Sequence, residues 1–426
     1  MNNSLNYNRI KIGIIGLGYV GLPLAVRFSK KFRVIGYDFN SFRIKLLKKG
    51  IDINSVSKKN FLLNSNIVVT NNHNQLSNCN IFIITVPTPI YKNNLPDLRN
   101  LSSASKTVAK YLKFGDTVIL ESTVYPGYTN EVLIPFLEKK KNFKINKDFY
   151  VGYSPERINP GDNIKNLENI IKITSGSNKK SAEFIDNLYK SIVTAGTFKV
   201  ESIKIAEAAK VIENTQRDLN IAYVNELSII FRKMNLNVNK ILEAAGTKWN
   251  FLNFKPGLVG GHCISVDPFY LTYQSKKFGY NPRFILSGRS INEYMPNYIY
   301  KEIKKILLHI KLNKPKILFC GLTFKENISD IRNSKSLTLL KYISKLSNKI
   351  ECYDPYVIYD NTLKKNKVNI VKEPKKNYYD LIIITVSHNY FKKLGINFFK
   401  KSAKKNHPIF DVKSIFECKD KNYLTL

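Results

Sequence analysis

A glycine-rich turn near the N-terminus constrains the fold of this chain more than any other feature. Residues 11–16 form a short apolar run typical of a buried strand, and residues 22–28 read as a helix with proline in its first turn. The turn between them, residues 16–21, reads Gly-Leu-Gly-Tyr-Val-Gly. A second apolar run, residues 33–37, follows the helix and ends at Asp38. This order of strand, turn, helix and strand predicts a βαβ unit with parallel strands.

Further apolar runs of strand length follow. Residues 67–70, 81–86 and 117–120 are each closed by a polar or proline-containing loop. Strands that alternate with helical stretches predict an α/β architecture, in which helices cover both faces of a parallel sheet. The same pattern returns near the C-terminus, in residues 316–321, 349–353 and 381–386. The two ends of the chain therefore look like one architecture used twice.

A long helix separates these two α/β regions. Between about residues 202 and 233, apolar side chains recur at spacings of three and four, which predicts one apolar face. The residues of that face are Ala208, Val211, Ile212, Leu219, Ala222 and Tyr223. Helical sequence continues to about residue 310. We therefore expect two Rossmann-like, doubly wound parallel-sheet domains, residues 1–198 and 313–426, joined by the long central helix and a helical middle domain, residues 199–312.

Composition narrows the class of protein. The formal net charge is +36, but 57 of the 68 basic residues are lysines spread along the whole chain. We interpret this excess as a solvated basic surface and expect no nucleic-acid partner. No apolar run approaches the roughly 18 residues that span a bilayer, and residues 1–9 lack a secretory signal, so we expect no membrane partner and a cytoplasmic location. Five scattered cysteines, none in CxxC spacing, argue against a disulfide framework and a metal site.

The glycine-rich turn carries the first functional signal. Gly16 and Gly18 allow a tight turn and the close approach of a pyrophosphate, and Gly21 lets the helix pack against the strand. The helix N-terminus adds amide donors and a positive dipole end. Asp38, about twenty residues on, is placed for a ribose diol, which predicts NAD in preference to NADP because a carboxylate repels a 2′-phosphate. Arg43 slightly weakens this preference, since a guanidinium can bind that phosphate.

The second signal is the segment 260–267, which reads Gly-Gly-His-Cys-Ile-Ser-Val-Asp. Its two glycines bring backbone amides close to the sulfur of Cys263, whose thiolate could attack a carbonyl and form a covalent intermediate. Asp267, one turn away if the segment is helical, could orient a base or a water. Taken alone, a single cysteine is more often a small buried hydrophobe, and His262 alone is more often structural.

The third signal lies on the long helix. Lys210, Asn214 and Arg217 are spaced i, i+4 and i+7, so they share one face opposite the apolar face. In a lysine-rich chain the ordinary interpretation is a solvated polar face. The functional interpretation places an amine, an amide and a guanidinium in a cleft between the two α/β regions.

Together these segments resemble the nucleotide-sugar 6-dehydrogenases, the family of the UDP-glucose and UDP-N-acetylhexosamine dehydrogenases. The resemblance runs in order over about residues 10–420. Its motifs are GxGYVGLPLA with Asp38, Val-Pro-Thr-Pro at 86–89, Glu-Ser-Thr-Val at 121–124, Ser-Pro-Glu-Arg at 154–157, the helix with Lys210 and Asn214, Gly-Gly-His-Cys at 260–263, and Gly-Leu-Thr-Phe-Lys-Glu-Asn at 321–327 with Asp-Ile-Arg at 330–332. Residues 154–162, 247–252 and 256–263 most resemble the branch that acts on UDP-N-acetyl-D-glucosamine.

The resemblance implies a role for each matching residue. Cys263 is the nucleophile, Lys210 is the proton donor and acceptor or oxyanion stabiliser, and Asn214 stands beside it. The hydrolytic water is handled by Glu156, Thr123 and Asp267. The residues implied to hold NAD are Gly16, Gly18, Tyr19, Val20, Gly21, Asp38, Arg43, Thr88, Thr123 and Arg332. Those implied to bind the UDP-sugar substrate are Arg157, Ile158, Lys210, Asn214, Arg217, Gly260 and Lys325.

The implied reaction is a four-electron, NAD-dependent oxidation of the C6 alcohol of UDP-N-acetyl-D-glucosamine to the uronic acid. It passes through a thiohemiacetal and a thioester on Cys263 and provides a precursor of capsule, O-antigen or exopolysaccharide. The resemblance also implies a homodimer or higher homo-oligomer formed through the long helix, with Lys248 and Arg289 reaching a neighbouring subunit. Ser265, where this branch commonly has glycine, and residues 328–329, Ile-Ser in place of Cys-Pro, are departures that bear only on fine specificity.

Alternatives remain open at this stage. The preferred substrate could be UDP-N-acetylgalactosamine, UDP-N-acetylmannosamine or UDP-glucose. A two-electron dehydrogenase of the hydroxyacid type shares the glycine-rich turn and a helical lysine–asparagine pair but needs no nucleophilic cysteine, so the NADH formed per substrate distinguishes it. A basic Rossmann-like binding protein without turnover is the remaining alternative. The presence of Cys263, Lys210 and Asn214 argues against it.

Overall fold

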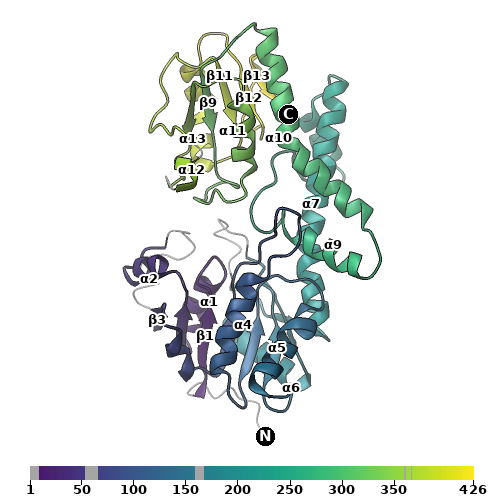
Figure 1. The fold of residues 1–426 in the computed structure, drawn as a ribbon. Coiled ribbons are helices and arrows are strands. Elements are labelled where there is room, and N and C mark those ends of the chain that lie inside the picture. The colour runs from purple at the N-terminus through teal and green to yellow at the C-terminus, as the bar shows by residue number, and fades with distance from the viewer. Residues whose placement is uncertain (1–8, 53–65, 159–166, 359–360, 366) are drawn as a thin grey trace. The chain divides into compact units, whose positions relative to one another are not determined.

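The computed structural model describes residues 9–52, 66–158, 167–358, 361–365 and 367–426 (Figure 1). The chain divides into two compact units. The first comprises Met1–Glu213 with Phe269–Asn281, and the second comprises Asn214–Pro268 with Pro282–Leu426. Of the three division points, two fall inside helices, α7 (Ile203–Lys233) and α9 (Asp267–Lys277), so each of these helices contributes residues to both units. The three-domain division expected from the sequence stays a prediction.

The first unit is built on an eight-stranded sheet in the order β3-β2-β1-β4-β5-β6-β7-β8. The strands are β1 (Lys11–Ile15), β2 (Arg33–Tyr37), β3 (Ile67–Thr70), β4 (Ile81–Ile84), β5 (Thr117–Leu120), β6 (Tyr150–Tyr153), β7 (Lys172–Gly176) and β8 (Thr197–Lys199). The first six follow the doubly wound order of a dinucleotide-binding sheet, which confirms the predicted fold class. One pair, β6 with β7, is antiparallel. An antiparallel neighbour needs no crossover helix, and the described parts of this connection contain none.

Helices cover both faces of this sheet (Figure 1). They are α1 (Gly21–Phe28), α2 (Ser41–Lys48), α4 (Arg99–Tyr111), α5 (Ile134–Lys141) and α6 (Lys179–Lys190), with a 3₁₀ segment at His73–Asn78 and a π-helical turn at Thr129–Leu133. Every residue of β4 and β5 is buried, as expected of strands with helices on both sides. One core cluster joins Ile12 and Ile14 of β1 to Phe28 of α1 and to Leu188 and Tyr189 of α6.

The second unit contains a five-stranded sheet in the order β10-β9-β11-β12-β13, with every neighbouring pair parallel. This is the other common doubly wound order. Its strands are β9 (Ile317–Cys320), β10 (Ile350–Tyr353), β11 (Leu381–Ile384), β12 (Ile409–Asp411) and β13 (Tyr423–Thr425). The helices of this unit are α8 (Val238–Ala245), α10 (Arg283–His309), α11 (Lys335–Ile343), α12 (Asn361–Lys365) and α13 (Asn389–Ser402). The expectation of a second parallel-sheet region at the C-terminus is therefore confirmed.

Helix α10 shows how sequence spacing places a helix on this second sheet. Met295, Ile299, Ile303 and Leu307 recur every four residues, so they lie along one side of the helix. All four are buried in one cluster with Ile317 and other sheet residues. The apolar face predicted for the long helix α7 is only partly covered. Val211 and Ala222 are buried, whereas Ile212 and Tyr223 are each 55% exposed.

The predicted apolar face of α7 is covered along one edge only in the single chain. Adjacent residues of a helix differ by about 100° around its axis, so the side chains at 211 and 212, and likewise at 222 and 223, lie toward opposite edges of one apolar stripe. Val211 and Ala222 lie on the buried edge, and Ile212 and Tyr223 lie on the exposed edge.

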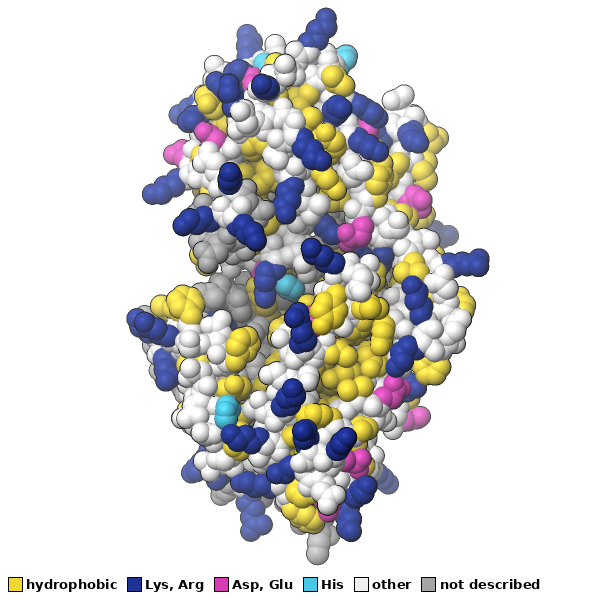
Figure 2. Space-filling view, viewed as in Figure 1, with side chains coloured by type: hydrophobic (Ala, Val, Ile, Leu, Met, Phe, Trp, Pro, Cys, Tyr) yellow, Lys and Arg dark blue, Asp and Glu magenta, His cyan; other side chains and the backbone are white. Residues whose placement is uncertain are grey.

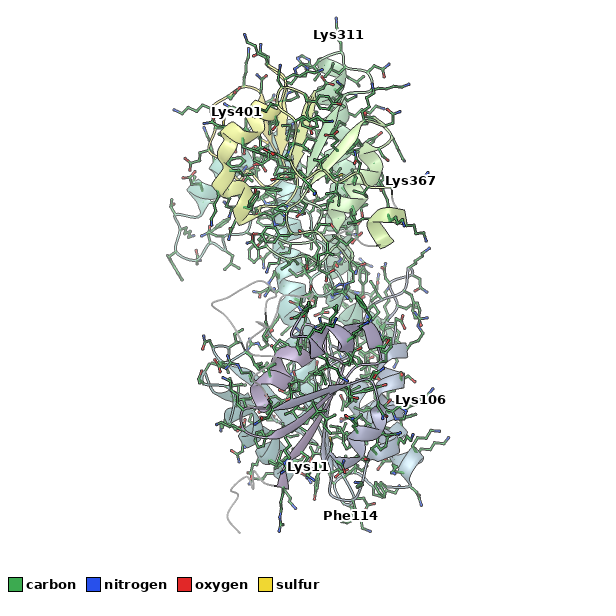
Figure 3. The ribbon with its side chains drawn as sticks, turned by 90° about the vertical axis from the view of Figure 1, so that its left-hand side faces the viewer. Lys11, Lys106, Phe114, Lys311, Lys367 and Lys401 are labelled. Carbon is green, nitrogen blue, oxygen red and sulfur yellow. The ribbon has the colours of Figure 1, made fainter. Side chains whose placement is uncertain are left out.

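The basic residues show no single concentration on the visible face. Figure 2 shows Lys and Arg side chains scattered over the surfaces of both units, with few acidic side chains between them. In Figure 3 the labelled lysines Lys106, Lys311, Lys367 and Lys401 point outward from their elements. This distribution agrees with the interpretation of a solvated basic surface. Among the helices of the described residues, none is both long and apolar enough to span a bilayer.

Candidate active site

The turn after β1 has the geometry that its glycines predict. Gly16 adopts a φ of +99°, in the left-handed region that favours glycine, and its N–H donates to the carbonyl of Tyr37 at 2.8 Å. A Cβ on Gly21 would lie 1.9 Å from the carbonyl oxygen of Gly16. Only glycine at 21 therefore lets α1 begin this close to the strand.

The next glycine faces open space. A Cβ built on Gly18 meets no heavy atom within 4 Å, and Gly18 lies three residues before the start of α1. The carboxylate of Asp38 accepts from the N–H of Leu17 at 2.9 Å and from the N–H of Asn40 at 2.9 Å. An open glycine, a helix N-terminus and an anchored carboxylate at the end of β2 together fit the pyrophosphate and ribose of a dinucleotide.

Arg43 lies beneath this turn. Its Nε and Nη2 donate to the carbonyl of Leu17 at 3.2 and 3.0 Å, and its Nη1 lies 2.7 Å from Oδ1 of Asp52. The side chain of Arg43 is buried. The guanidinium is thus committed to the turn and to an internal carboxylate, which removes the argument that Arg43 favours NADP. In this position Arg43 holds the glycine-rich turn in place.

Two threonines implied in the site follow β4 and β5. Thr88 and Thr123 are both half-buried, and the carbonyl of Thr88 accepts from the hydroxyl of Tyr270 at 3.1 Å. The strands β1, β4 and β5 are neighbouring and parallel, so their carboxyl ends meet at one edge of the sheet. Thr88 and Thr123 therefore lie at the same edge as the glycine-rich turn, where Tyr19 and Val20 are also half-buried.

Glu156 comes after β6 and is held by three donors. Its Oε1 accepts from the backbone N–H groups of Arg157 at 2.6 Å and of Ile158 at 2.7 Å. Its Oε2 lies 3.0 Å from Nζ of Lys172, the first residue of β7. The same Nζ donates at 2.9 Å to Oε2 of Glu121, which comes directly after β5. The hydroxyl of Tyr189, in α6, donates to the other oxygen of Glu121.

The charges of this cluster are unusual because all of its side chains are buried. Burial raises the pKa of the Glu121 carboxyl, although the neighbouring Lys172 opposes this. Burial alone would lower the pKa of Lys172, but the carboxylates of Glu121 and Glu156 outweigh it and raise that pKa. Burial and the charge of Glu121 raise the pKa of Tyr189 well above its usual value. The single ammonium of Lys172 is therefore paired with two carboxylates, those of Glu121 and Glu156.

The residues directly after Glu156 are partly described. Arg157 donates from Nη1 to the carbonyl of Ile171 at 2.9 Å, and its Nη2 lies 2.8 Å from Glu213 of α7. Ile158 is half-buried and packs against the core of the first unit. The rest of the predicted motif, residues 159–162, lies outside the described residues. Lys210 is buried on α7, one turn before the half-buried Glu213.

In the second unit, Cys263 is exposed and stands four residues before the start of α9. The N–H groups of Val266 and Asp267 donate to its carbonyl at 3.0 and 2.8 Å, so the segment closes a turn that leads into the helix. Asn214 of α7 donates from Nδ2 to Oδ2 of Asp267 at 2.6 Å, and both side chains are buried. The structure thus brings together two predicted site residues, Asn214 and Asp267, directly beside the cysteine loop.

The loop before Cys263 is fixed by two further contacts. A Cβ on Gly260 would lie 2.6 Å from the carbonyl oxygen of Asn333, and one on Gly261 would lie 2.6 Å from the ring of Phe324. The N–H of Gly257 donates to Oδ1 of Asn225 at 2.7 Å. The loop therefore packs between α7 and the segment 324–333. Ser265, a departure from the branch pattern, donates to the carbonyl of Gly261 at 2.7 Å.

Three predicted ligand-binding residues of the second unit have different surroundings. Arg332 forms a two-pronged pair with Asp330, with Nη2 at 2.6 Å from Oδ2, and its side chain is 55% exposed. Burial would raise the pKa of Asp330, but His262 and Arg332 outweigh it and hold that pKa well below the usual range. Lys325 is half-buried, and Arg217 is exposed, unlike its predicted companions Lys210 and Asn214. The predicted contact of Arg332 with NAD stays a prediction.

The five cysteines differ in accessibility. Cys79, Cys320 and Cys352 are buried, and burial raises the pKa of Cys79 and of Cys352 to about 12 each and that of Cys320 well above its usual value. These thiols stay protonated and out of reach. Cys263 is exposed and Cys418 is intermediate, so the candidate nucleophile is among the accessible thiols.

One prediction about neighbouring subunits is wrong for this chain. Arg289 of α10 is 2% exposed, and its Nη1 lies 2.6 Å from Oδ1 of Asp218 within the same unit. A second nitrogen pairs with Glu293. A guanidinium buried in this way cannot reach a neighbouring subunit. Lys248, by contrast, is exposed, and so is the adjacent Trp249, at 92%.

The sequence did not point to Lys172. One lysine among 57 carries no signal, and nothing in its neighbourhood marks it as buried. Glu121 stood inside a recognised motif but had no role assigned to it. A buried lysine at the start of a strand becomes conspicuous only when its two carboxylate partners are placed beside it. Within the described ranges, no group of three or more His, Cys, Asp or Glu side chains is arranged to hold a metal ion.

Sequence profiles of one family match the chain in three consecutive segments. Residues 10–193 match the NAD binding domain of the UDP-glucose/GDP-mannose dehydrogenase family, residues 204–294 match its central domain, and residues 318–418 match its UDP binding domain. The three segments cover most of the chain. The first contains the glycine-rich turn, the second contains the cysteine loop and the long-helix residues Lys210, Asn214 and Arg217, and the third contains most of the second sheet.

Individual proteins are similar over nearly the full length. UDP-N-acetyl-D-glucosamine 6-dehydrogenase from Salmonella typhi is 49% identical over 411 residues, which cover 96% of this chain and 97% of that protein. The protein of the same name from Pseudomonas aeruginosa is 47% identical, over 98% and 99%. Among solved structures, UDP-D-ManNAc dehydrogenase from Pyrococcus horikoshii superimposes with a TM-score of 0.86 at 32% identity, over 98% of each chain.

Proposed function

The chain belongs to the UDP-glucose/GDP-mannose dehydrogenase family of NAD-dependent oxidoreductases, and we propose from this membership that it oxidises the C6 alcohol of UDP-N-acetyl-D-glucosamine to the carboxylate. The observation that carries the choice of sugar is the near-half identity to two full-length proteins of that name. The mannosamine enzyme superimposes well but shares only 32% of its residues. UDP-N-acetylgalactosamine, which differs by one hydroxyl inversion, is the nearest competing substrate.

The cofactor site is built from residues of the first unit. Gly16, Gly18 and Gly21 shape the turn, Asp38 takes the ribose, and Arg43 holds the turn from below. Tyr19, Val20, Thr88 and Thr123 complete the site at the same sheet edge, and we assign Arg332 of the second unit to the cofactor as well. NAD, when bound, would supply the hydride acceptor, and a fresh NAD would be needed for each of the two successive oxidations.

Cys263 is assigned as the nucleophile. Its exposed thiol adds to the aldehyde formed by the first oxidation, which gives a thiohemiacetal that can be oxidised to a thioester. Lys210 and Asn214, one helical turn apart on α7, bind the developing oxyanion, and Lys210 also takes the proton of the C6 alcohol. The hydrogen bond from Asn214 to Asp267 fixes the orientation of that amide.

Release of the product requires a water molecule. We assign its activation to Glu156, supported by Thr123 and Asp267. Arg157, Ile158, Arg217, Gly260 and Lys325 are assigned to the sugar nucleotide. The support for these assignments is their place in the matched segments and the burial of Glu156 and Asp267, which excludes a purely solvated role.

We further propose a three-part division into residues 1–198, 199–312 and 313–426, supported by the three consecutive profile matches.

A homodimer or higher homo-oligomer through α7 is supported by the exposed Ile212 and Tyr223 on that helix. The protein would act in the cytoplasm, where UDP-sugars and NAD are available, and its uronic acid product would supply capsule, O-antigen or exopolysaccharide synthesis. Sedimentation of the purified protein tests the oligomer, and a fully active monomer would contradict it.

The substrate is tested with a panel of UDP-sugars and NAD, following NADH absorbance. We expect the highest kcat/KM with UDP-N-acetyl-D-glucosamine and two NADH per sugar consumed. One NADH per sugar would indicate the two-electron hydroxyacid type. UDP-glucose as the best substrate would contradict the assigned branch.

The nucleophile is tested by Cys263→Ser. Serine is much less ionised than cysteine near neutral pH, so this variant should stop partway and form a slowly hydrolysed ester or a trace of aldehyde, with little carboxylate. Mass spectrometry of the protein after incubation with substrate and NAD measures the adduct. Lys210→Ala should instead slow both oxidations. Cys418→Ser is the matched control, because it removes a partly accessible thiol outside the proposed site. Carboxylate formation by Cys263→Ser at near the parent rate would remove Cys263 from the mechanism.

A further inference from the structure

The two oxygens of Glu156 have unequal surroundings. Oε1 accepts two backbone N–H groups, from Arg157 and Ile158, at 2.6 and 2.7 Å. Two donors occupy both lone pairs of that oxygen, so a proton cannot reside there. A proton taken up by Glu156 must therefore sit on Oε2, the oxygen that lies 3.0 Å from Nζ of Lys172. The oxygen of Glu156 that can take a proton is thus the one in contact with Lys172.

The ammonium of Lys172 also contacts a second carboxylate. Its ammonium is 2.9 Å from Oε2 of Glu121, a carboxylate whose side chain is fully buried. The hydroxyl of Tyr189 donates to the other oxygen of Glu121, and the Lys172 ammonium lies 5.3 Å from the centre of the Tyr189 ring. When Glu156 is protonated, Lys172 and Glu121 remain as a neutral pair. When Glu156 is ionised, the cluster carries one excess negative charge.

We propose that Glu121 and Lys172 are positioning residues that set the basicity of Glu156 for the activation of water. This proposal rests on the proposed function, which assigns that activation to Glu156. Lys172 holds Oε2 in place, while Glu121 offsets the ammonium charge so that Glu156 can still accept a proton. In the step concerned, the water oxygen bonds to the thioester carbon and a water proton moves to Oε2 of Glu156. The carbon–sulfur bond then breaks and returns the thiolate of Cys263.

Glu121 and Lys172 have opposite electrostatic effects on Glu156, so the proposal predicts pH shifts of opposite sign for their variants. Removing the negative charge of Glu121 leaves the ammonium to act on Glu156 alone and makes it a weaker base. Removing the positive charge of Lys172 leaves Glu156 beside a second buried carboxylate and makes it a stronger base. A residue pair that only supported the fold would slow the reaction without moving its pH dependence in opposite directions.

The experiment measures thioester breakdown against pH in single-turnover reactions. Samples are quenched, and the acyl adduct on Cys263 is quantified by mass spectrometry. In Glu121→Gln the midpoint of the acidic limb should move down by about one pH unit, and in Lys172→Gln it should move up by about one unit. In the double variant the two removed charges cancel, so the midpoint should return to within about half a unit of the parent value.

Folding is controlled for in two ways. Lys172→Gln leaves two buried carboxylates without a cation and can fail to fold. The double variant buries two neutral amides instead, so Glu121→Gln and the double variant alone still test the proposal. Lys190→Gln is the matched control, because it removes an exposed lysine of α6 that pairs with Asp186. This control should leave the midpoint unchanged.

The outcomes distinguish this proposal from the function on which it rests. If the parent protein forms no NADH with any UDP-sugar, the proposed function fails. If the parent turns over and accumulates the acyl adduct, but Glu121→Gln leaves the midpoint in place or raises it, the function stands and the role of the pair is overturned. A downward shift in Glu121→Gln that the added Lys172→Gln change reverses supports the proposal.

Discussion

The turn after β1 and the turn after β9 begin alike. Gly16 and Gly321 come directly after the first strand of their sheets, with φ angles of +99° and +90°. Each glycine N–H donates to a tyrosine carbonyl of the neighbouring strand, at 2.8 Å for Gly16 and at 3.0 Å for Gly321. The partners are Tyr37 and Tyr353, the last residues of β2 and β10. The turn after the first strand thus has the same local geometry in two sheets of different strand order.

The similarity extends to the acid next to each tyrosine. Oδ2 of Asp38 accepts from the N–H of Leu17 at 2.9 Å, and Oδ2 of Asp354 accepts from the N–H of Leu322 at 2.6 Å. A threonine completes both frames, since the hydroxyls of Thr85 and Thr385 donate to the carbonyls of Gly16 and Gly321 at 2.7 and 2.6 Å. The frame therefore consists of a glycine, an acid and a threonine.

The two turns differ beyond this frame. In the first, Gly18 faces open space and α1 starts at Gly21. In the second, the position five residues after the first glycine is Glu326, and the next helix starts only at Lys335. The space near the acid is filled by His388, which is fully buried, with Nε2 3.3 Å from Oδ2 of Asp354.

The same histidine accepts from the N–H of Asn327 at Nδ1, at 3.0 Å, and stacks on Tyr356 at 4.7 Å between ring centres. A buried side chain therefore stands beside the acid of the second turn, whereas the first turn has open space at Gly18. The comparison teaches that the glycine and acid alone specify a frame, and that the later glycines and the early helix specify a dinucleotide site.

The largest expected effect comes from breaking the helix start. In Gly21→Ala the new Cβ would meet the carbonyl oxygen of Gly16 at 1.9 Å and the hydroxyl oxygen of Thr85 at 2.4 Å, so the start of α1 would have to shift. We expect roughly 100-fold weaker NAD binding, or about 3 kcal/mol, measured by calorimetric titration. Glu326→Ala, at the equivalent position of the second turn, should leave NAD affinity unchanged. Parent-like affinity in Gly21→Ala would show that close helix packing is not what separates the two turns.

A third turn, at residues 127–129, is also held by a carboxylate, that of Glu207. This residue of α7 accepts from the N–H groups of Gly127 and Thr129 at 2.5 and 2.9 Å, and burial raises its pKa to about 7. The folded chain therefore binds this proton more tightly than the unfolded chain. The stability that the proton provides is complete below about pH 4.5 and is lost as the pH rises through 7.

Glu207→Gln cannot ionise and should remove that pH dependence. Between pH 4.5 and 8, the free energy of unfolding of the variant should rise relative to the parent by up to roughly 3 kcal/mol. Denaturant unfolding at several pH values measures this slope. Glu226→Gln, an exposed position of the same helix, is the control and should parallel the parent. If the unfolding free energy of the variant kept the full pH dependence of the parent, the ionisation of Glu207 would not be the source of that dependence.

Exchanging the two acids for alanine separates their tasks. Asp38→Ala should raise the KM for NAD about tenfold by loss of the ribose contact. It should not create NADP activity, because Arg43 is paired with Asp52. Asp354→Ala should leave the KM for NAD unchanged and reduce stability by about 1–3 kcal/mol, because His388 and the N–H of Leu322 lose their partner. Equal effects of both variants on the KM for NAD would contradict the difference in function.

The smallest effect tests the shared frame itself. Thr85→Val and Thr385→Val each remove one buried hydroxyl that donates to the first glycine of its turn. Each should cost about 1 kcal/mol locally, by a similar amount in both units. Hydrogen exchange of the peptides that contain β1 and β9 measures the two losses separately. A loss confined to one unit would mean that the two frames are not equivalent.

Local patterns predicted several elements with their bounds. The runs at 33–37, 67–70 and 117–120 are strands with those bounds, and the helix expected over about 202–233 is Ile203–Lys233. These succeeded because strand burial, helical periodicity and the need for glycine at a positive φ are read within a few residues. Local patterns did not show which edge of the apolar face of α7 is covered, because that depends on the elements packed against the helix.

The sequence by itself determined the two doubly wound α/β regions, the dinucleotide turn with its acid, and the motif around Cys263 as a candidate site. Only the tertiary structure decided which charges meet. Lys172 lies 51 residues from Glu121, and Asn214 lies 53 residues from Asp267, yet each pair is within 2.9 Å. The sequence around Arg289 gives no sign that this side chain is buried, because its partner Asp218 lies 71 residues away in the chain. The identity of a distant partner leaves no mark on local periodicity, because only the packing of the intervening elements brings the two side chains together.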